Sequence, residues 1–273
     1  MASALDDLLA ALPTDEVARV EAVFHAFTHP RPRPLTEEEQ ALMARAEGQV
    51  MSGQDGLFRL WTWRRPGGGP RVLLVHGWES RASHWLAWVP SLLAAGFDVV
   101  AIDGPGHGEE RGKPTHVLAL ARATVQAART LGPLQGLVGH SAGSAACLYA
   151  FAQGIQTRAS VHISGPTHLT RVLDQVAGAA LPPTLWPAFH RRFETFLGQP
   201  AADFDLPRLS VGLGRHKALL LHDPVDAEVP FSSAETLRDA WPGALLETVE
   251  GLGHRRILRA PEVVARAVGF LAA

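Results

Sequence analysis

Short apolar runs alternate with longer amphipathic stretches over most of the chain, from residue 56 onward. The runs are apolar at nearly every position, which is typical of strands that are buried on both faces of a parallel sheet. They predict strands at 57–63, 72–75, 99–102, 137–138, 161–163 and 219–221, with a strand-like stretch at 244–249. The intervening stretches predict helices at 85–95, 117–131, 142–151, 234–240 and 261–271. This alternation predicts an α/β fold, in which helices flank a mostly parallel central sheet.

The first 55 residues have a wholly helical pattern. Four leucines recur at helical spacing until a proline ends the pattern, and Thr14 is placed to cap a second helix. After a proline-rich linker, Thr36 opens a third helix with Glu39 as its capping-box partner. About 50 residues with so little apolar area would be marginally stable alone. We therefore predict an N-terminal helical extension over residues 1–55, packed on a domain over residues 56–273.

One long stretch interrupts the alternation of strands and helices. Residues 167–215 carry no strand pattern, several helix fragments and five prolines. They are too many for an ordinary connection between neighbouring strands. The aromatic residues there recur at roughly helical spacing, at Trp186, Phe189, Phe193 and Phe196. The stretch is therefore expected to be a small helical cap, whose aromatic side chains form its own core or also line a substrate pocket.

The composition narrows the classes of function. The net charge is -2, from 25 basic and 27 acidic residues, and no basic stripe appears, which argues against a nucleic-acid partner. The single cysteine, Cys147, excludes an intrachain disulfide and is expected to be a small buried apolar residue. The first residues lack the positive start of a signal peptide, and no apolar run has the length of a membrane span. We expect a cytoplasmic protein.

A candidate nucleophile lies between a predicted strand and a predicted helix. Residues 139–143 read Gly-His-Ser-Ala-Gly, which matches the pattern G-x-S-x-G in the context that gives this pattern its meaning. The glycines leave room for a tight turn that holds Ser141 at the carboxyl end of the sheet, with its hydroxyl exposed. Ala142 then opens the helix, where its backbone N–H can stabilise a developing oxyanion.

A serine hydroxyl needs a general base, and His254 is the best placed of the 13 histidines. It follows the strand-like stretch 244–249 and precedes the last predicted helix, so it lies in a loop at the same edge of the sheet as Ser141. The alternative is that His254 only caps or packs the last helix.

Three acids in one loop compete to orient the imidazole. Residues 222–230 read His-Asp-Pro-Val-Asp-Ala-Glu-Val-Pro and follow the predicted strand 219–221. Asp223 is nearest the strand end and is suited to bond backbone N–H groups of the loop. Asp226 lies further round the loop, where it is free to turn toward His254, so we favour Asp226 over Asp223 and Glu228.

The loop after the strand 72–75 supplies a second candidate oxyanion donor. A glycine at position 77 lets the backbone bend across the strand ends, so that the N–H of Trp78 can point at the reacting carbonyl and its indole into the pocket. The alternative is a tight turn with a core tryptophan. We expect the pocket to be lined by Trp78, His140, Trp186 and Phe189. Residues 103–108 read Asp-Gly-Pro-Gly-His-Gly and are interpreted as a structural turn near the site.

Taken together, five motifs resemble the α/β-hydrolase superfamily. They are HGW at 76–78, DGPGHG at 103–108, GHSAG at 139–143, HDPVDAEVP at 222–230 and GLGH at 251–254. The resemblance covers residues 57–273. It implies a catalytic triad of Ser141, Asp226 and His254, with the backbone N–H groups of Trp78 and Ala142 as the oxyanion hole. It also implies a cap between the sixth and seventh strands, and chemistry that needs no metal or organic cofactor.

The reaction that this resemblance favours is hydrolysis of small-molecule carboxylic esters with small to medium acyl chains. A thioesterase, a carbon–carbon bond hydrolase and a cofactor-free peroxidase-like enzyme use the same triad and stay open as alternatives. Reactions that need a carboxylate nucleophile are disfavoured by Ser141. A non-catalytic ligand receptor on the same fold is the alternative from another class, although such proteins commonly lose a triad residue. The oligomeric state cannot be predicted from these patterns.

Overall fold

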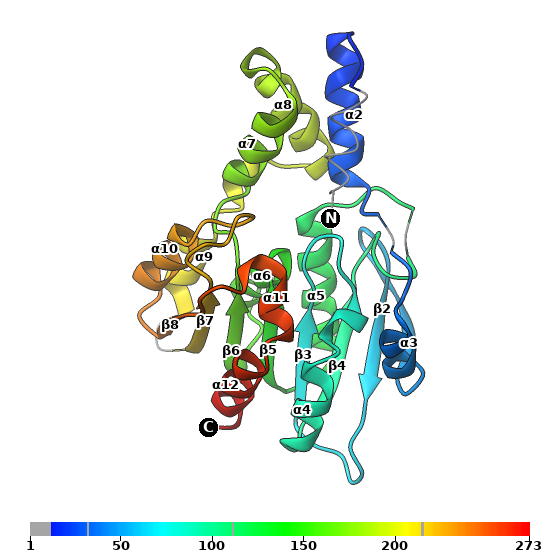
Figure 1. Cartoon of the computed structure of the whole chain (residues 1–273), viewed down its shortest axis with the longest axis vertical. Helices are drawn as coiled ribbons and strands as arrows, with labels where there is room; N and C mark the ends of the chain where they lie inside the picture. The colour runs from blue at the N-terminus through cyan, green and yellow to red at the C-terminus, as the bar shows by residue number, and fades with distance from the viewer. Residues whose placement is uncertain (1–11, 32, 111, 214–215) are drawn as a thin grey trace.

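A computed structural model of the chain describes residues 12–31, 33–110, 112–213 and 216–273 (Figure 1). Within these residues lies an eight-stranded sheet with the order β1-β2-β4-β3-β5-β6-β7-β8. Strand β2 is antiparallel to both of its neighbours, and β3 to β8 are all parallel. The strands are β1 (Glu47–Gly53), β2 (Gly56–Trp63), β3 (Arg71–Val75), β4 (Asp98–Asp103), β5 (Leu134–His140), β6 (Thr157–Ile163), β7 (Lys217–His222) and β8 (Ala244–Thr248).

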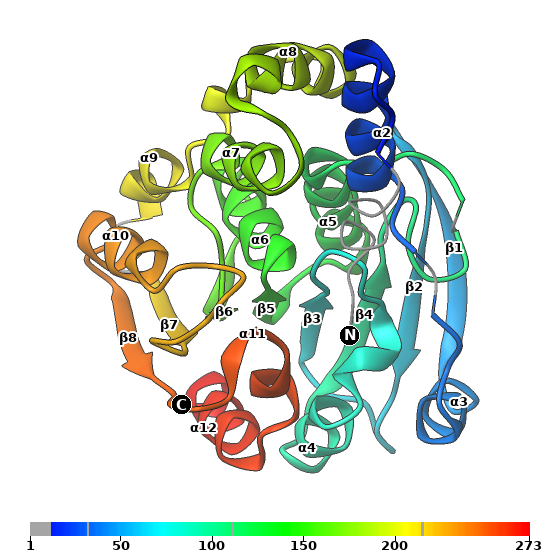
Figure 2. The ribbon, with the colours of Figure 1, turned by 45° about the horizontal axis from the view of Figure 1, so that its top comes forward.

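The parallel strands separate two apolar cores, one on each face of the sheet. In β3, Leu73 and Val75 belong to one core, and Val72 and Leu74 to the other. This explains the continuous apolar runs in the sequence, because both faces of each strand are buried. One face is covered by α5 (Val117–Leu131), α6 (Ala142–Ala152) and α10 (Ser232–Ala240), and the other by α4 (Trp88–Ala94) and α12 (Pro261–Ala272) (Figures 1 and 2).

The sheet order places a crevice at the carboxyl ends of β3 and β5. Strand β4 pairs with one side of β3 and β5 pairs with the other, so the connections that leave β3 and β5 diverge. Ligands of open α/β sheets bind where connections diverge in this way. We call the four loops at this end of the sheet, over residues 76–80, 140–142, 223–230 and 249–254, the carboxyl edge.

The prediction of a wholly helical segment before residue 56 is wrong for residues 47–53, which form β1. This strand pairs with β2 along its whole length, and most of its side chains are exposed. The sequence of β1 therefore shows no alternation of apolar residues that would predict a strand. Backbone hydrogen bonds to β2, rather than buried side chains, keep β1 in the sheet. A side chain at Gly48 would also lie within 2.8 Å of the Trp61 indole, so the strand depends on a glycine there.

The N-terminal helices otherwise follow the predicted pattern. Helix α2 (Glu16–Thr28) begins one residue later than predicted, because Asp15 rather than Thr14 caps it, accepting the Ala18 N–H at 2.8 Å. Helix α3 (Glu37–Met43) has the predicted capping box between Thr36 and Glu39, with bonds of 3.2 and 3.1 Å. The predicted first helix, with its leucines at 5, 8, 9 and 12, falls almost entirely outside the described residues.

The predicted cap is helical throughout its described part. It comprises α7 (Leu169–Ala180), η2 (Pro183–Leu185), α8 (Trp186–Leu197), η3 (Ala201–Asp203), α9 (Leu206–Ser210) and η4 (Val211–Leu213), and its extended pairing is limited to a single bridge between His168 and Asp205. The remaining short elements are η1 (Ala82–Trp85), α11 (Gly253–Arg256) and η5 (Ile257–Arg259).

Helix α2 joins the cap and lies beside α8 above the carboxyl edge (Figure 2). The Phe24 and Phe196 rings meet edge to face with their centroids 5.4 Å apart. Arg192 covers the Phe24 ring at 3.6 Å and forms an ion pair with Glu21 at 2.6 Å. We call the helices α2, α7 and α8 the roof. The N-terminal extension is therefore part of the cover of the site and not an appendage.

No helix in the described part of the chain is long and apolar enough to cross a membrane. Cys147 is fully buried on α6, as predicted, and burial raises the pKa of its thiol well above the ordinary value. The cytoplasmic location and the absence of a nucleic-acid partner stay predictions.

Candidate active site

Ser141 occupies a strained turn between β5 and α6. Its φ of 53° and ψ of -122° lie in a region that residues with a side chain rarely adopt. Two glycines make the turn fit: a Cβ at Gly139 would lie 2.5 Å from the Gly143 carbonyl oxygen, and one at Gly143 would lie 2.0 Å from that of Val75. The Ser141 N–H donates to the Ile163 carbonyl at 2.8 Å. The strain therefore fixes the serine above the strand ends, as the G-x-S-x-G pattern predicts.

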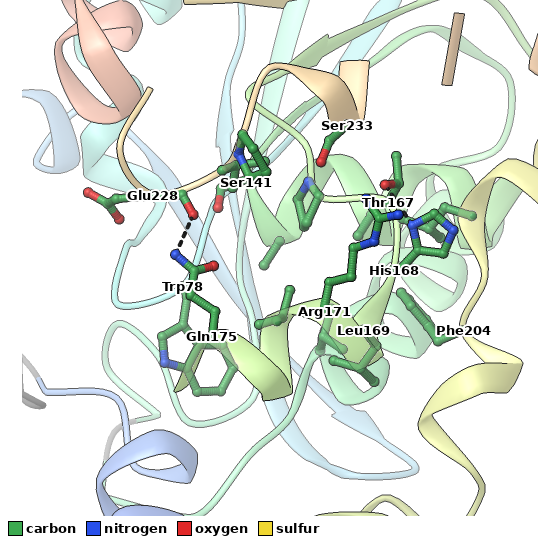
Figure 3. A pocket seen from close by; sticks show the side chains of 18 of the residues that line it. Trp78, Ser141, Thr167, His168, Leu169, Arg171, Gln175, Phe204, Glu228 and Ser233 are labelled. Carbon is green, nitrogen blue, oxygen red and sulfur yellow. Dashed lines mark hydrogen bonds between the residues drawn. The ribbon is translucent and has the colours of Figure 1, made fainter. Parts of the chain in front are cut away.

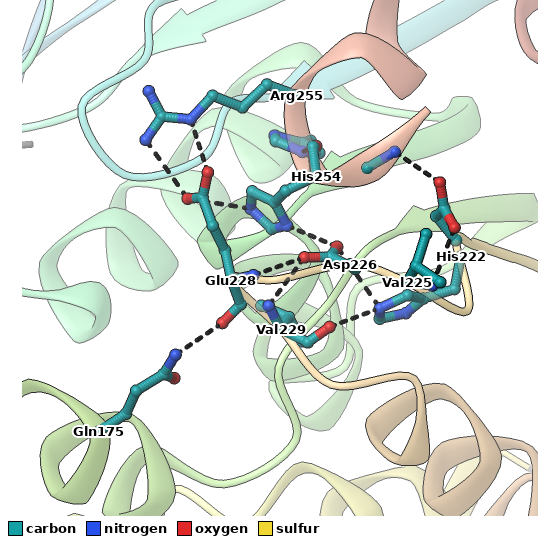
Figure 4. A network of polar contacts seen from close by, with 11 residues as sticks. Gln175, His222, Val225, Asp226, Glu228, Val229, His254 and Arg255 are labelled. Carbon is teal, nitrogen blue, oxygen red and sulfur yellow. Dashed lines mark hydrogen bonds and ion pairs between the residues drawn. The ribbon is translucent and has the colours of Figure 1, made fainter. Parts of the chain in front are cut away.

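His254 and Asp226 form a buried pair at the carboxyl edge. The distance from His254 Nδ1 to Asp226 Oδ2 is 2.8 Å, and the aspartate side chain is fully buried (Figure 4). The other carboxylate oxygen accepts the backbone N–H groups of Glu228 and Val229, at 2.8 and 2.9 Å. Burial alone would raise the pKa of Asp226, but the hydrogen bond and charge of His254 and the two N–H donors lower it to about 2. The carboxylate is therefore ionised at neutral pH.

The other two acids of the loop have different partners. Asp223 accepts the N–H of Val225 at 2.9 Å and that of Gly253 at 2.5 Å, so it fastens the acid loop to the histidine loop. These N–H donors outweigh its burial and lower the pKa of Asp223. Glu228 forms an ion pair with Arg255 at 2.8 Å, and one of its carboxylate oxygens lies 3.9 Å from His254 Nε2. The structure thus brings Asp226, among the three, into hydrogen-bond contact with His254.

His254 and Ser141 share two adjoining cavities, which both residues line. No hydrogen bond joins Ser141 Oγ to the His254 ring within the described residues, and such bonds often shorten only when a substrate is bound. His140 lies beneath, with its ring 4.8 Å from that of His254 and its Nε2 hydrogen-bonded to the His254 carbonyl at 2.8 Å. Burial, and then the charge of His254, lowers the pKa of His140 to about 3, so it stays neutral and supports the loop.

The two predicted oxyanion donors, the N–H groups of Trp78 and Ala142, lie in segments next to Ser141. A Cβ at Gly77 would lie 3.0 Å from the Ser141 Cβ, so a glycine allows the chain before Trp78 to pass close to the nucleophile. Ala142 begins α6, where the helix leaves its first N–H groups without intrahelical partners. Within the described residues neither the Trp78 nor the Ala142 N–H bonds a backbone carbonyl. That these two N–H groups bind the oxyanion stays a prediction.

The turn at 103–108 supports this arrangement, as the sequence predicted. Asp103 accepts the Ala82 N–H at 2.6 Å and the Trp61 indole N–H at 2.9 Å. His76 Nε2 accepts the Gly104 N–H at 3.0 Å, and His76 Nδ1 lies 2.7 Å from the Gly77 carbonyl, to which it donates. Burial lowers the pKa of His76, which keeps the ring in this neutral form.

Two cavities meet at the serine. The first has a volume of about 250 Å³ and extends under the roof, between α5, α6 and α7; the second has about 700 Å³ and extends over the loop that follows His254. The residues that line both cavities are Phe27, Trp78, Ser141, Glu228 and His254. Apolar side chains form most of the first cavity, including Val117, Ala145, Leu169, Val172, Phe193, Phe204 and Leu206 (Figure 3).

The predicted pocket residues fall in different places. Trp78 lines both cavities and His140 only the second. Trp186 and Phe189 line neither of these two cavities: the Trp186 indole N–H bonds the Leu181 carbonyl at 3.1 Å, and Phe189 is fully buried inside the roof. Sequence reasoning missed Phe27, because nothing in the pattern of α2 indicates that this helix lies over the site.

Among the described residues, no group of three or more His, Cys, Asp or Glu side chains is placed to hold a metal ion. That the reaction needs no cofactor stays a prediction. The groups gathered at the carboxyl edge are instead a hydroxyl, an imidazole paired with a carboxylate, and two backbone N–H donors. This set performs nucleophilic acyl transfer in serine hydrolases on several folds.

Comparison with known proteins agrees with this geometry. Residues 70–254, more than half of the chain, match the family described as alpha/beta hydrolase fold. The chain belongs to the alpha/beta hydrolase family. The predicted fold class is therefore confirmed, and the protein is an enzyme of this hydrolase class. No curated protein matches the sequence.

Several solved structures share the fold of this α/β hydrolase at low sequence identity. The Pyrococcus furiosus esterase Pf2001 is 18% identical, with a TM-score of 0.67 over 89% of this chain and 95% of its own. An esterase from Exiguobacterium antarcticum is 16% identical, with a TM-score of 0.63 over 83% of this chain and 100% of its own. Est1E from Butyrivibrio proteoclasticus, solved with ferulic acid bound, is 14% identical, with a TM-score of 0.65 over 82% of this chain and 100% of its own.

Proposed function

We propose that this α/β hydrolase cleaves carboxylic esters through an acyl-enzyme intermediate on Ser141. The observation that carries the proposal is the His254–Asp226 pair, joined at 2.8 Å, whose histidine lines the same cavities as Ser141. An ionised, buried carboxylate holds the imidazole in the tautomer that leaves Nε2 free to take a proton.

In the first half of the reaction, Ser141 Oγ attacks the ester carbonyl and His254 Nε2 takes the hydroxyl proton. The carbonyl π electrons move to its oxygen, and the tetrahedral oxyanion is bound by the N–H groups of Trp78 and Ala142. Collapse of the intermediate breaks the bond to the alcohol oxygen, which receives the proton from His254. Water, deprotonated by His254, then attacks the acyl-enzyme, and the acid leaves as Ser141 recovers its proton.

We assign the acyl group to the first cavity and the alcohol to the second. The alcohol must lie beside the imidazole that protonates it, and the second cavity is lined by the residues that follow His254, namely Arg255, Arg256, Leu258 and Arg259. The first cavity is lined by Ala142 and Ala145, on the far side of the serine. A volume of about 250 Å³ with mostly apolar walls suits a small to medium acyl chain.

The test combines a fluorophosphonate probe with a panel of p-nitrophenyl esters from acetate to decanoate, on the wild type and on Ser141→Ala. We expect the wild type to be labelled and to hydrolyse esters of short and medium chains. In Ser141→Ala, labelling should vanish and kcat should fall by about 10⁴-fold or more, since the variant has no nucleophile.

Other outcomes would contradict the proposal in defined ways. Labelling without ester turnover would show that Ser141 is a reactive nucleophile but that esters are not its substrates. Thioesters or substrates cleaved at a carbon–carbon bond would then be favoured. Turnover that survives in Ser141→Ala would exclude the acyl-enzyme on this residue. A folded wild-type protein that is neither labelled nor active would favour a non-catalytic receptor.

A further inference from the structure

One end of the first cavity is polar, in contrast to its apolar walls. Thr167, His168, Arg171 and Ser233 line it there. Figure 3 shows the Arg171 side chain reaching toward Thr167 and His168, with Ser233 on the same side of the view and Ser141 away from them. We call these four residues the polar subsite.

The charge of Arg171 has no partner within the described residues. The acid one turn later on α7, Asp174, bonds His190 at 3.0 Å. The acid nearest His168 is Asp205, and the two form a pair at 3.8 Å. The carboxylate of Glu228, which also lines the cavity, is held by Arg255 at 2.8 Å. Arg171 is exposed at this end of the cavity, and a guanidinium there without an acid partner can bind an anion through its fork of N–H donors.

The Ser233 hydroxyl also lacks a partner. The residue is 4% exposed and lines the cavity, and its hydroxyl makes no hydrogen bond within the described residues. The hydroxyl oxygen is accessible from the cavity, so it can donate a hydrogen bond to an acceptor bound there. Arg171 lies in the first turn of α7, whose N-cap, His168, makes no side-chain capping bond, so the positive end of that helix adds to the potential. Ser233 and Arg171 therefore favour the same occupant, an anionic acceptor.

We propose that the polar subsite binds a carboxylate carried by the acyl part of the substrate, so that half-esters of dicarboxylic acids are preferred over neutral esters. This inference rests on the proposed esterase function and on the placement of the acyl group in the first cavity. A carboxylate fits because its two oxygens match the planar fork of the Arg171 guanidinium and accept the Ser233 hydroxyl. The apolar walls, including Leu169 and Phe204, suit the methylene chain between the carboxylate and the ester carbonyl.

The experiment compares monomethyl esters of succinic, glutaric, adipic and suberic acids with methyl alkanoates of the same chain length, following released methanol. Methyl esters are used because p-nitrophenyl half-esters of short diacids cyclise unaided. For the wild type we expect kcat/KM to be about tenfold higher for the best half-ester than for its neutral match. In Arg171→Met the ratio of kcat/KM for the half-ester to kcat/KM for its neutral match should fall to about one. Arg171→Lys, which keeps the charge without the fork, should be intermediate.

Arg191→Met is the matched control, because Arg191 is an exposed arginine of the same cap that lines neither cavity. It should keep the wild-type preference. Ser233→Ala should reduce the preference for half-esters over neutral esters by about threefold, because one hydrogen bond to the carboxylate is lost. The preference should also weaken as salt rises, since Arg171 is exposed and its charge is screened.

A binding measurement separates failure of the subsite from failure of the esterase. Calorimetry on Ser141→Ala with monomethyl adipate should give a Kd about tenfold lower than for Ser141→Ala combined with Arg171→Met. Equal affinities in the two backgrounds, or a wild type that does not distinguish half-esters from neutral esters, would overturn the subsite while leaving the esterase intact. A preference confined to esters whose alcohol carries the carboxylate would overturn the assignment to the acyl side.

Discussion

The carboxyl edge and the roof of this α/β hydrolase are built by different physical means. At the edge, positions are fixed by the backbone: Ser141 has a φ of 53°, and a Cβ at Gly143 would lie 2.0 Å from a carbonyl oxygen. In the roof, α2 and α8 meet through side chains, such as Phe27 and Phe193, whose rings lie 5.4 Å apart. Backbone constraints allow little adjustment, whereas packed side chains can shift. The edge therefore sets the chemistry, and the roof sets what fits beneath it.

The sharpest way to probe the edge is to change one of its two buried aspartates. Asp226→Asn should lower kcat by about 10⁴-fold, because an amide no longer holds the imidazole in its productive tautomer or stabilises the imidazolium. The measurement is turnover of a p-nitrophenyl ester that the wild type hydrolyses.

Asp223→Asn is the matched variant, since Asp223 bonds the N–H groups of Val225 and Gly253 rather than the His254 ring. We expect kcat within tenfold of the wild type, together with a lower Tm. If Asp223→Asn were as inactive as Asp226→Asn, the separate roles of the two acids would be wrong.

The roof is probed at Phe27, which lines both cavities and lies 5.8 Å from the Trp78 ring. Phe27→Ala should lower kcat/KM by about fivefold to tenfold, mainly through KM, and cost about 1–2 kcal/mol of stability for a partly buried ring. Steady-state kinetics and thermal unfolding measure the two effects. Val17→Ala, at a position on the same helix that is 73% exposed, should change neither. If Phe27→Ala lowered kcat as much as Asp226→Asn does, the proposed division between an edge that sets the chemistry and a roof that sets substrate binding would be wrong.

The smallest expected effect is a dependence of stability on pH that originates at the edge. His140 is buried there, and its pKa is lowered from 6.5 to about 3. In the unfolded chain His140 is protonated below about pH 6.5, whereas in the folded chain it stays neutral down to about pH 3. The free energy of unfolding therefore decreases as pH falls below about 6.5. One such histidine contributes about 1 kcal/mol per pH unit below pH 6.

Unfolding by urea between pH 7 and 5 measures this slope. The slope should be shallower in His140→Gln, because the glutamine amide can still donate to the His254 carbonyl from the position of Nε2 but does not titrate. An unchanged slope in this variant would assign the acid sensitivity to other groups.

The same contrast explains what the sequence could predict. The strands, the strained turn at Ser141 and the approach of Asp226 to His254 depend on residues close together in the chain or on loops that leave adjacent strands. Their patterns could therefore be interpreted locally. Strand β1 could not, since its exposed side chains leave backbone hydrogen bonds as its main support.

The roof was predicted less well because its packing partners are distant in the chain. The aromatic residues of the cap showed helical spacing, but that spacing does not indicate which face of α8 lines the first cavity. Packing against α2 decides it: Phe189 is buried in the roof, whereas Phe193 lines the cavity. Phe27 could not be identified as a cavity residue for the same reason.

The pairing of α2 with α8 also has a consequence for the order of folding. Glu21 and Arg192, which join the two helices, are 171 residues apart. At synthesis rates of about 5–20 residues per second, α2 leaves the ribosome about 10 to 30 seconds before its partner exists. During that interval the apolar face of α2, with Phe24 and Phe27, has nothing of the cap to pack against. The cover of the cavities is thus expected to close only after strands β1 to β6 and the strained turn at Ser141 have been synthesised.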